Sequence, residues 1–452
     1  MRSPGFLLLA LWPAVAAAQQ DRLAHAVARE VERLATRPYW PGYDPAAIPL
    51  AVFDGRETLL FRHPSPPEGF RSFVGGSPAA HVFEGRHPAV TSNSSAEIGG
   101  VATATVLADG ARAAIPARTL AAVAIHEAFH VFQRARHPAW SGNEGDLLLY
   151  PVDDARLLAL RRMETEAWRR ALAGHDRAAA ACWAKAALGA RRERFGGMDS
   201  AFVQYERLTE LNEGLAAYVQ LLARDTALAF PAGEFAATDV RGRVYVVGPA
   251  LALLLDRFAP GWKERLEAHD TQALDGMLAA ALPAGAASGS RSCRLDAGER
   301  AAIERLARAD TAAVIAGRIA KRREFDDRAG WRLVVRAAPG RPLWPQGFDP
   351  LNVDRVEGGL LHSRFLRLGN DAGEISAIDE SDADLEALTV AAGRHPLFNG
   401  IREVVIAGIP HPDVVIERDS VRLRAPGLML RFSGAAVRQL GKTLTIELGV
   451  AR

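Results

Sequence analysis

The chain has 452 residues, of which 49% are hydrophobic, and a formal net charge of +2. This length predicts two or three domains with ample material for buried cores. The near-neutral charge, without a long basic run, argues against nucleic acid or an anionic membrane surface as a partner. Arginine and alanine are abundant while lysine is scarce, a composition typical of a GC-rich genome, so we expect a bacterial protein.

The amino terminus has the pattern of a secretory signal peptide. Arg2 supplies a positive charge, Phe6 to Val15 an apolar stretch, and Ala16 to Ala18 a small-residue cleavage site. The apolar stretch is too short to span a bilayer, so we expect no stable membrane anchor. The sequence therefore predicts export to the periplasm or the medium after cleavage near Ala18. Export would permit a Cys182–Cys293 disulfide, although two unpaired buried cysteines are an open alternative.

The first elements after the signal are a helix and several short strands. Asp21 to Thr36 has apolar residues at three- and four-residue spacing, which indicates an amphipathic helix. Glu97 to Leu107 is expected to be a longer strand. Within it, Ile98 to Thr105 is a candidate sheet edge that could pair with an extended substrate, and an ordinary core strand is the alternative. The other strands are predicted at Ile48 to Phe53, Thr58 to Phe61 and His81 to Phe83.

The next segment, Ala121 to Phe132, contains the pentad His126-Glu127-Ala128-Phe129-His130. Residues four apart lie on one face of a helix, so the two imidazoles can hold one metal ion between successive turns. This is the HExxH arrangement of zinc peptidases, in which the glutamate is the general base. Pro116 fits the first turn of such a helix, and its apolar neighbours predict that the helix is buried.

Helical patterns fill most of the middle of the chain. They are expected at Val152 to Ala173, Asp176 to Arg194, Asp199 to Arg224, onward through Leu255, Gly261 to His269, Thr271 to Leu282 and, as one helix or a bent pair, Leu295 to Arg328, with a loop at Pro283 to Ser292.

From Trp331 onward, short alternating runs separated by Gly, Pro, Asn and Asp predict a β-rich domain. Its histidines His362, His395 and His411 form no ligand pair and are expected to be surface or packing residues. The strands are predicted at Trp331 to Arg336, Leu360 to Leu368, Leu385 to Val390, Val414 to Glu417, Leu428 to Phe432 and Leu444 to Leu448.

A catalytic zinc ion needs a third protein ligand. The third histidine of metzincins is absent, because Arg136 occupies its position. The segment Leu211 to Tyr218, LNEGLAAY, instead resembles the LNEG-F-A-x-Y segment of the aminopeptidase N and leukotriene hydrolase family and, more loosely, the NE segment of thermolysin. This resemblance to gluzincins implies a zincin-like catalytic domain in which Glu213 is the third Zn²⁺ ligand.

Four other carboxylates near this motif have open roles. Glu206 and Glu210 share a helix face with Glu213, so they could orient ligands, although solvated helix charges are the simpler interpretation. Glu164 and Glu166 are rival third ligands. Ala217 stands where thermolysin has an aspartate that orients a metal-bound histidine, so another group must do this here.

The same family has a Tyr-x-x-Gly motif at the start of a helix, and its tyrosine donates a hydrogen bond to the reacting oxyanion. Tyr245-Val246-Val247-Gly248 matches this pattern before an apolar stretch, so the resemblance implies a catalytic role for Tyr245. A tyrosine that only packs is the alternative.

The chain also departs from the family. Glu213 follows His130 by 83 residues, which requires a helical insertion at about 138–198, and no GAMEN-like segment is present to hold a substrate amino terminus. We therefore predict an α+β protein with a signal peptide (1–18), a zincin-like catalytic domain (19–329) with a small β-sheet followed by a mostly helical part, and a β-rich accessory domain (330–452).

The predicted activity is zinc-dependent hydrolysis of peptide bonds, with a peptide or protein as substrate. His126, His130 and Glu213 would hold Zn²⁺, Glu127 would act as general base, and Tyr245 would stabilise the oxyanion. A zinc hydrolase of a non-peptide bond and a non-catalytic zinc-containing binding protein are the alternatives. The sequence does not indicate an oligomeric state.

Overall fold

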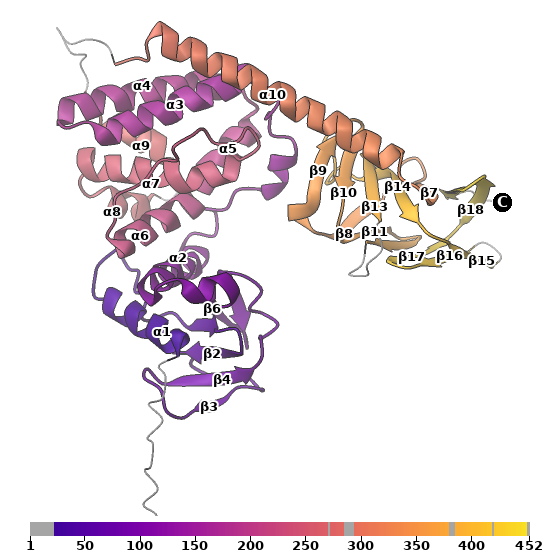
Figure 1. Ribbon diagram of the computed structural model, residues 1–452, viewed down its shortest axis with the longest axis horizontal. Coiled ribbons are helices and arrows are strands. Elements are labelled where there is room, and N and C mark those ends of the chain that lie inside the picture. The colour runs from indigo at the N-terminus through magenta and orange to yellow at the C-terminus, as the bar shows by residue number, and fades with distance from the viewer. Residues whose placement is uncertain (1–21, 270–271, 284–292, 379–384, 418–419, 450–452) are drawn as a thin grey trace, which may run out of the picture. The chain divides into compact units, whose positions relative to one another are not determined.

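The computed structural model describes residues 22–269, 272–283, 293–378, 385–417 and 420–449 (Figure 1). The predicted signal peptide lies outside the described residues. The chain divides into two compact units. The first comprises the residues up to Trp140 with Asn212–Leu228 and Gly261–Gln272, and the second comprises Ser141–Leu211, Ala229–Pro260 and Ala273–Arg452.

The first unit contains a six-stranded mixed sheet in the order β3-β4-β2-β1-β6-β5. Its centre is built from apolar runs, and β1 and β2 are buried along their whole length. Strand β1 pairs in parallel with β6, while the other neighbours are antiparallel. The strands are β1 (Leu50–Phe53), β2 (Glu57–Phe61), β3 (Arg71–Phe73), β4 (Ala80–Glu84), β5 (Ser94–Ile98) and β6 (Val101–Leu107).

The single strand predicted from Glu97 to Leu107 is wrong. Gly99 and Gly100 have φ angles of 55° and 77° and form the turn between β5 and β6. These angles lie in the left-handed region, which glycine adopts without steric strain. Most of the predicted edge strand, Ile98 to Thr105, therefore lies in β6, which has partners on both sides, and the true edge strand is β5.

The helices of the first unit are α1 (Leu23–Leu34), α2 (Ala117–Arg136), α6 (Leu215–Arg224) and α8 (Trp262–Ala268), and a short 3₁₀ turn, η1 (Gly110–Ala114), precedes α2. Helix α2 packs against α1, α6 and β6 (Figure 1). It begins directly after Pro116, and its buried residues include Leu120, Ala121 and Ile125. The predicted buried helix is confirmed.

The second unit begins with a helical part made of η2 (Glu144–Leu148), α3 (Ala155–Ala173), α4 (Arg177–Gly196), α5 (Ser200–Thr209), α7 (Val240–Phe258), α9 (Leu274–Ala281) and α10 (Ala297–Asp326). A disulfide joins Cys182 of α4 to Cys293 before α10. Helix α10 is a single 30-residue helix with an Asp296–Glu299 capping box.

A buried ion-pair network holds the helices of this part together. It contains Arg191, Arg194, Arg243, Glu164, Glu206 and Glu210, all at most 2% exposed. Arg194 Nη2 lies 2.7 Å from Glu164 Oε2, Arg243 Nη2 lies 2.7 Å from Glu164 Oε1, and Arg191 Nη1 lies 2.9 Å from Glu210 Oε2. The prediction that Glu206 and Glu210 are solvated helix charges is therefore wrong.

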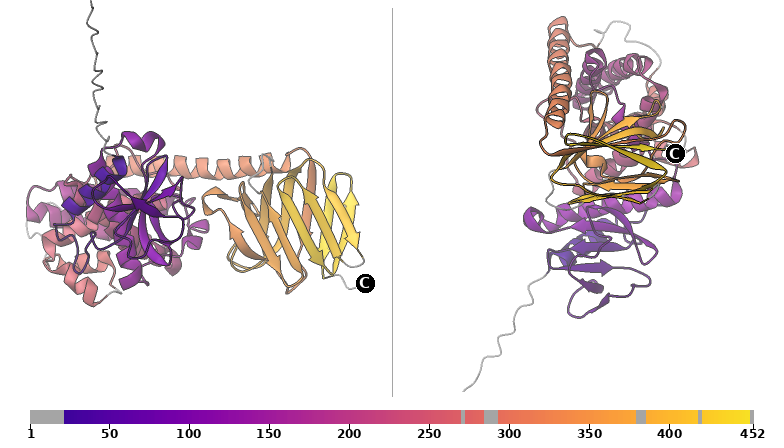
Figure 2. Two further views of the ribbon diagram at one scale, coloured as in Figure 1. Left: turned by 90° about the horizontal axis from the view of Figure 1, so that it is seen from below. Right: turned by 90° about the vertical axis from the view of Figure 1, so that its right-hand side faces the viewer.

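The C-terminal β-rich region is confirmed, and it contains two sheets that enclose one apolar core (Figure 2). The seven-stranded sheet has the order β18-β19-β7-β14-β13-β10-β9, with β7 (Trp331–Arg336), β9 (Val353–Val356), β10 (Gly359–His362), β13 (Glu386–Ala391), β14 (Ile401–Ile409), β18 (Ala435–Leu440) and β19 (Thr443–Leu448). The six-stranded sheet has the order β15-β16-β17-β12-β11-β8, with β8 (Trp344–Phe348), β11 (Leu366–Asn370), β12 (Gly373–Ala377), β15 (Asp413–Glu417), β16 (Ser420–Ala425) and β17 (Leu428–Ser433). A 3₁₀ turn, η4 (Pro350–Asn352), precedes β9.

Several details of this region differ from the prediction, and strands β8, β9, β12, β16 and β18 were not predicted. The run Leu360 to Leu368 is not one strand, because β10 and β11 belong to different sheets. The nine-residue strand β14 was not predicted. It has partners on both sides, so its mostly buried residues do not alternate between apolar and polar types.

In the described part of the chain, no single helix has the length and hydropathy needed to cross a membrane, and only α7 and α8 meet this test together, as a bent pair.

We predict that the β-rich region loses stability in acid because of His362. Its imidazole is buried, and burial lowers its pKa from 6.5 to about 4. The unfolded chain therefore binds the proton first, so stability is fully present above pH 6.5 and falls as the pH drops toward 4, by up to about 3 kcal/mol. Urea unfolding at several pH values should show this loss.

The variant His362→Gln removes the proton-binding group and can retain a hydrogen bond to Thr389, which His362 contacts at 3.1 Å. Its unfolding free energy should depend less on pH than that of the wild type between pH 6.5 and 4. The exposed His411→Gln should behave as the wild type does. Equal pH dependence in all three proteins would refute the assignment.

Candidate metal site

Helix α2 places the two histidines of the pentad side by side. His126 and His130 are one helical turn apart, and their Nε2 atoms lie 3.1 Å from each other. The buried apolar side chains of α2 are mostly Ala, Ile and Phe. They pack against neighbouring elements, so the helix is held in one orientation. The spacing of four residues therefore produces the paired imidazoles that the sequence predicts.

Glu213 comes from the second helix that packs on this face. It lies in a π-helical segment, Glu210–Gly214, between α5 and α6, so the predicted helix Asp199 to Arg224 has an interruption at this point. Glu213 Oε2 lies 3.3 Å from His130 Nε2 and 3.8 Å from His126 Nε2. Single π turns of this kind are frequent at functional sites, because they change the direction of a side chain within a continuous helix.

These three atoms have the separations that a tetrahedral zinc ion needs. Zinc binds His nitrogen and carboxylate oxygen at about 2.0–2.2 Å, so two of its ligand atoms lie roughly 3.3 Å apart. The observed separations are 3.1, 3.3 and 3.8 Å. Within the described residues, this is the only group of His, Cys, Asp and Glu side chains that could hold a metal ion.

Two amides orient His130. Its Nδ1 lies 2.9 Å from Gln133 Oε1 and 3.2 Å from Asn212 Oδ1, both of which are acceptors. Gln133 Nε2 in turn donates to the Asn212 carbonyl at 3.0 Å. A proton on Nδ1 leaves the lone pair of Nε2 directed at the metal position. Gln133 and Asn212 therefore fix the orientation of the His130 ring.

The two imidazoles have different electrostatic surroundings. Burial lowers the pKa of His126, and hydrogen bonds that its ring donates to Glu213 and Gln220 only partly offset this. Burial also acts to lower the pKa of His130, but the contact with Glu213 outweighs it and the pKa is raised. A cation at this position would take over the charge that a proton on His130 otherwise supplies.

Glu127 follows His126 on α2, and it is buried. Burial raises the pKa of its carboxyl group to about 7, against an opposing effect of His130. A carboxyl group with a pKa near neutrality can both accept and return a proton, which is the property that a general base needs.

Tyr245 lies in a different part of the chain from these residues. It belongs to the second unit and lies inside α7, which begins at Val240, so it does not precede the helix as the sequence suggested. Its side chain is 37% exposed. Its role at the metal stays a prediction.

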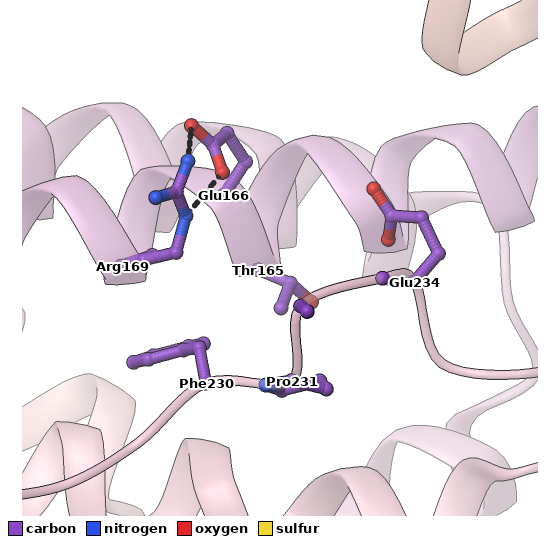
Figure 3. Close-up of a pocket in the computed structure, with 8 residues that line it drawn as sticks. Thr165, Glu166, Arg169, Phe230, Pro231 and Glu234 are labelled. Atoms are coloured by element: carbon purple, nitrogen blue, oxygen red, sulfur yellow. Dashed lines mark hydrogen bonds and ion pairs between the residues drawn. The ribbon is translucent and has the colours of Figure 1, made fainter.

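The rival ligands Glu164 and Glu166 have other partners. Glu164 accepts hydrogen bonds from the three buried arginines. Burial raises its pKa, but these arginines outweigh burial and hold the pKa well below its usual range. Glu166 lines a pocket of about 400 Å³ between α3 and residues 230–234, where it pairs with Arg169 at 2.6 Å (Figure 3).

Comparison with known proteins gives no relative. The chain matches no protein-family model, no curated protein and no solved structure.

We predict that Gln133→Leu binds zinc about 10- to 100-fold more weakly than the wild type. Leucine fills a similar buried volume but cannot accept the hydrogen bond from His130 Nδ1, and loss of such an outer contact typically has this effect on a metal site. Gln133→Glu retains an acceptor oxygen and should recover most of the affinity. Competition with a chromogenic chelator measures the dissociation constants.

Two further variants calibrate this result. Glu213→Ala removes a ligand and should weaken zinc binding more than Gln133→Leu does, whereas Glu166→Ala should leave it unchanged. If Glu166→Ala weakens binding and Glu213→Ala does not, the third ligand is wrong.

Proposed function

We propose that the protein is an exported zinc metallopeptidase of the gluzincin type, with a zincin-like catalytic domain. The observation that carries the proposal is the convergence of His126, His130 and Glu213 within ligand distance of one another, beside the buried carboxyl group of Glu127. Binding alone needs the three ligands but gives no reason for a fourth, proton-accepting carboxylate in this position. The combination supports hydrolysis.

When bound, Zn²⁺ would polarise a substrate carbonyl and lower the pKa of a water molecule. Glu127 would take a proton from the attacking water and return it to the leaving amine, a sequence for which a pKa near neutrality is suited. Gln133 and Asn212 would keep His130 in one tautomer during the cycle. Tyr245 would donate a hydrogen bond to the oxyanion.

The edge strand β5 is the proposed place for an extended substrate. It lies at the end of the sheet, beyond β6. Arg134 of α2 donates to the Ser95 carbonyl of β5 at 3.0 Å, which ties the strand to the helix that carries the metal ligands. A peptide could add to this edge through main-chain hydrogen bonds. This arrangement favours a peptide bond over other hydrolysable bonds.

The test compares the mature protein with its Glu127→Gln variant in a digest of a diverse peptide library, read by mass spectrometry. The amide of glutamine cannot act as a base, so we expect the variant to retain zinc but to lose turnover by at least about a hundredfold. New peptide termini should form with the wild type only, and their positions distinguish internal from terminal cleavage.

Retained cleavage by Glu127→Gln would contradict the role of Glu127. Absence of cleavage by a wild-type sample that contains zinc would contradict the peptidase proposal and favour a non-peptide bond or a binding role.

A further inference from the structure

The two outer faces of the C-terminal sheets differ in composition. The outer face of the seven-stranded sheet has an apolar patch, where Phe325 of α10 packs with Val334, Leu361 and Val405. The charged residues Arg336, Glu403 and Glu447 on the same face pair with one another. The outer face of the six-stranded sheet has exposed arginine and aromatic side chains instead. We define this surface, the Arg/Trp face, by Trp344, Phe365, Arg367, Arg422, Arg424, Met429 and Arg431.

The strand register places these residues in two adjacent rows. One row runs through Val415, Arg422, Arg431, Glu374, Gly369 and Trp344, and the next through Asp413, Arg424, Met429, Ser376, Arg367 and Gly347. The residues between these rows along each strand, such as Leu423, Leu430 and Ile375, point into the core. Six strands at about 4.8 Å spacing make this surface roughly 24 Å wide.

Charge is concentrated on this surface at a cost in stability. Arg422 and Arg431 are directly opposite each other on neighbouring strands, and like charges in this position destabilise a sheet. In the described residues, Arg367, Arg424 and Arg431 form no ion pair or hydrogen bond through their side chains. Even without Arg422, the three arginines Arg367, Arg424 and Arg431 outnumber Glu374 and Asp413, which leaves a positive surface that a negatively charged partner would stabilise.

Exposed apolar side chains lie on the same surface. Trp344 and Met429 are 47% and 51% exposed. Phe365 lies over Gly347, because a Cβ atom at Gly347 would be 2.9 Å from its ring. An exposed indole has a flat apolar face on which the C–H groups of a sugar ring can stack, and a guanidinium group binds a carboxylate with two parallel hydrogen bonds.

We propose that the Arg/Trp face binds an extended acidic glycan, with its sugar rings on Trp344 and Phe365 and its carboxylates on the arginines. The open, flat shape fits a polymer that lies across the strands better than a small molecule that needs enclosure. An acidic polypeptide would satisfy the arginines but gives no reason for the exposed indole. This binding does not depend on the proposed peptidase activity.

The experiment is isothermal titration calorimetry of the full mature chain with oligogalacturonate, a chain of uronic acids. A neutral maltooligosaccharide of equal length and oligoglutamate are the comparison ligands. We expect binding of oligogalacturonate that weakens with added salt, no binding of the neutral oligomer, and weaker binding of oligoglutamate.

The variants separate charge from stacking. Arg422→Ala/Arg431→Ala should bind oligogalacturonate about tenfold more weakly, and Trp344→Ala about fivefold more weakly. Arg300→Ala/Arg305→Ala removes two exposed arginines from α10 and should bind as the wild type does. Because the substituted side chains are exposed, folding should be retained, and circular dichroism checks this. If either Arg/Trp face variant misfolds, Arg424→Ala and Arg367→Ala, tested singly, take its place.

No binding of oligogalacturonate would overturn the proposal. So would wild-type affinity in Arg422→Ala/Arg431→Ala, or a loss in the α10 control as large as the loss on the Arg/Trp face. Two results together would identify an acidic polypeptide as the partner instead. These are equal affinities for oligoglutamate and oligogalacturonate, and an affinity for oligoglutamate that Trp344→Ala does not change.

Discussion

A buried carboxylate must be balanced by positive charge or by a bound proton, and this constraint governs both units. At the candidate metal site, Glu213 and Glu127 are less than a tenth exposed and lie with two imidazoles in a region almost closed to water. Leaving such charges without a partner is costly. A divalent cation held by His126, His130 and Glu213 would balance both carboxylates, and among the described residues these three side chains are the only group that could bind it.

The helical part of the second unit satisfies the same constraint without a metal. Its three buried glutamates face three buried arginines, so the network is neutral. Removing one partner from such a network leaves an unpaired buried charge, which typically costs about 3–5 kcal/mol. Glu164, although it belongs to a cluster of carboxylates, is therefore already balanced by arginines.

Local spacing made part of this structure predictable. The His126–His130 pair follows from the geometry of one helix, and the resemblance of LNEGLAAY to gluzincins implied Glu213. Gln133 was not predicted, because its partner Asn212 is 79 residues away in sequence and reaches it only through helix packing. The signal in the sequence that could have indicated Gln133 was its position, three residues after His130 in a buried helix.

The alternation of arginine with apolar residues in β16 and β17 indicates a charged sheet face. Which residues of the two strands lie opposite each other could not be predicted from either strand alone.

The buried state of Glu206 and Glu210 shows a limit of helical patterns. Three glutamates at helical spacing indicate one face, but whether that face meets solvent or arginine depends on α4, which is a separate segment of the chain. Similarly, the π turn at Glu210–Gly214 has no simple sequence signal, yet it contains Glu213, the proposed third ligand.

The most direct test of the metal site is anomalous X-ray diffraction at the zinc edge, on crystals of the mature protein grown with zinc. We expect one ion bound by His126 Nε2, His130 Nε2 and the Glu213 carboxylate, at about 2.0–2.2 Å from each. An anomalous peak at another position, a different carboxylate as third ligand, or no peak between α2 and α6 would contradict this account.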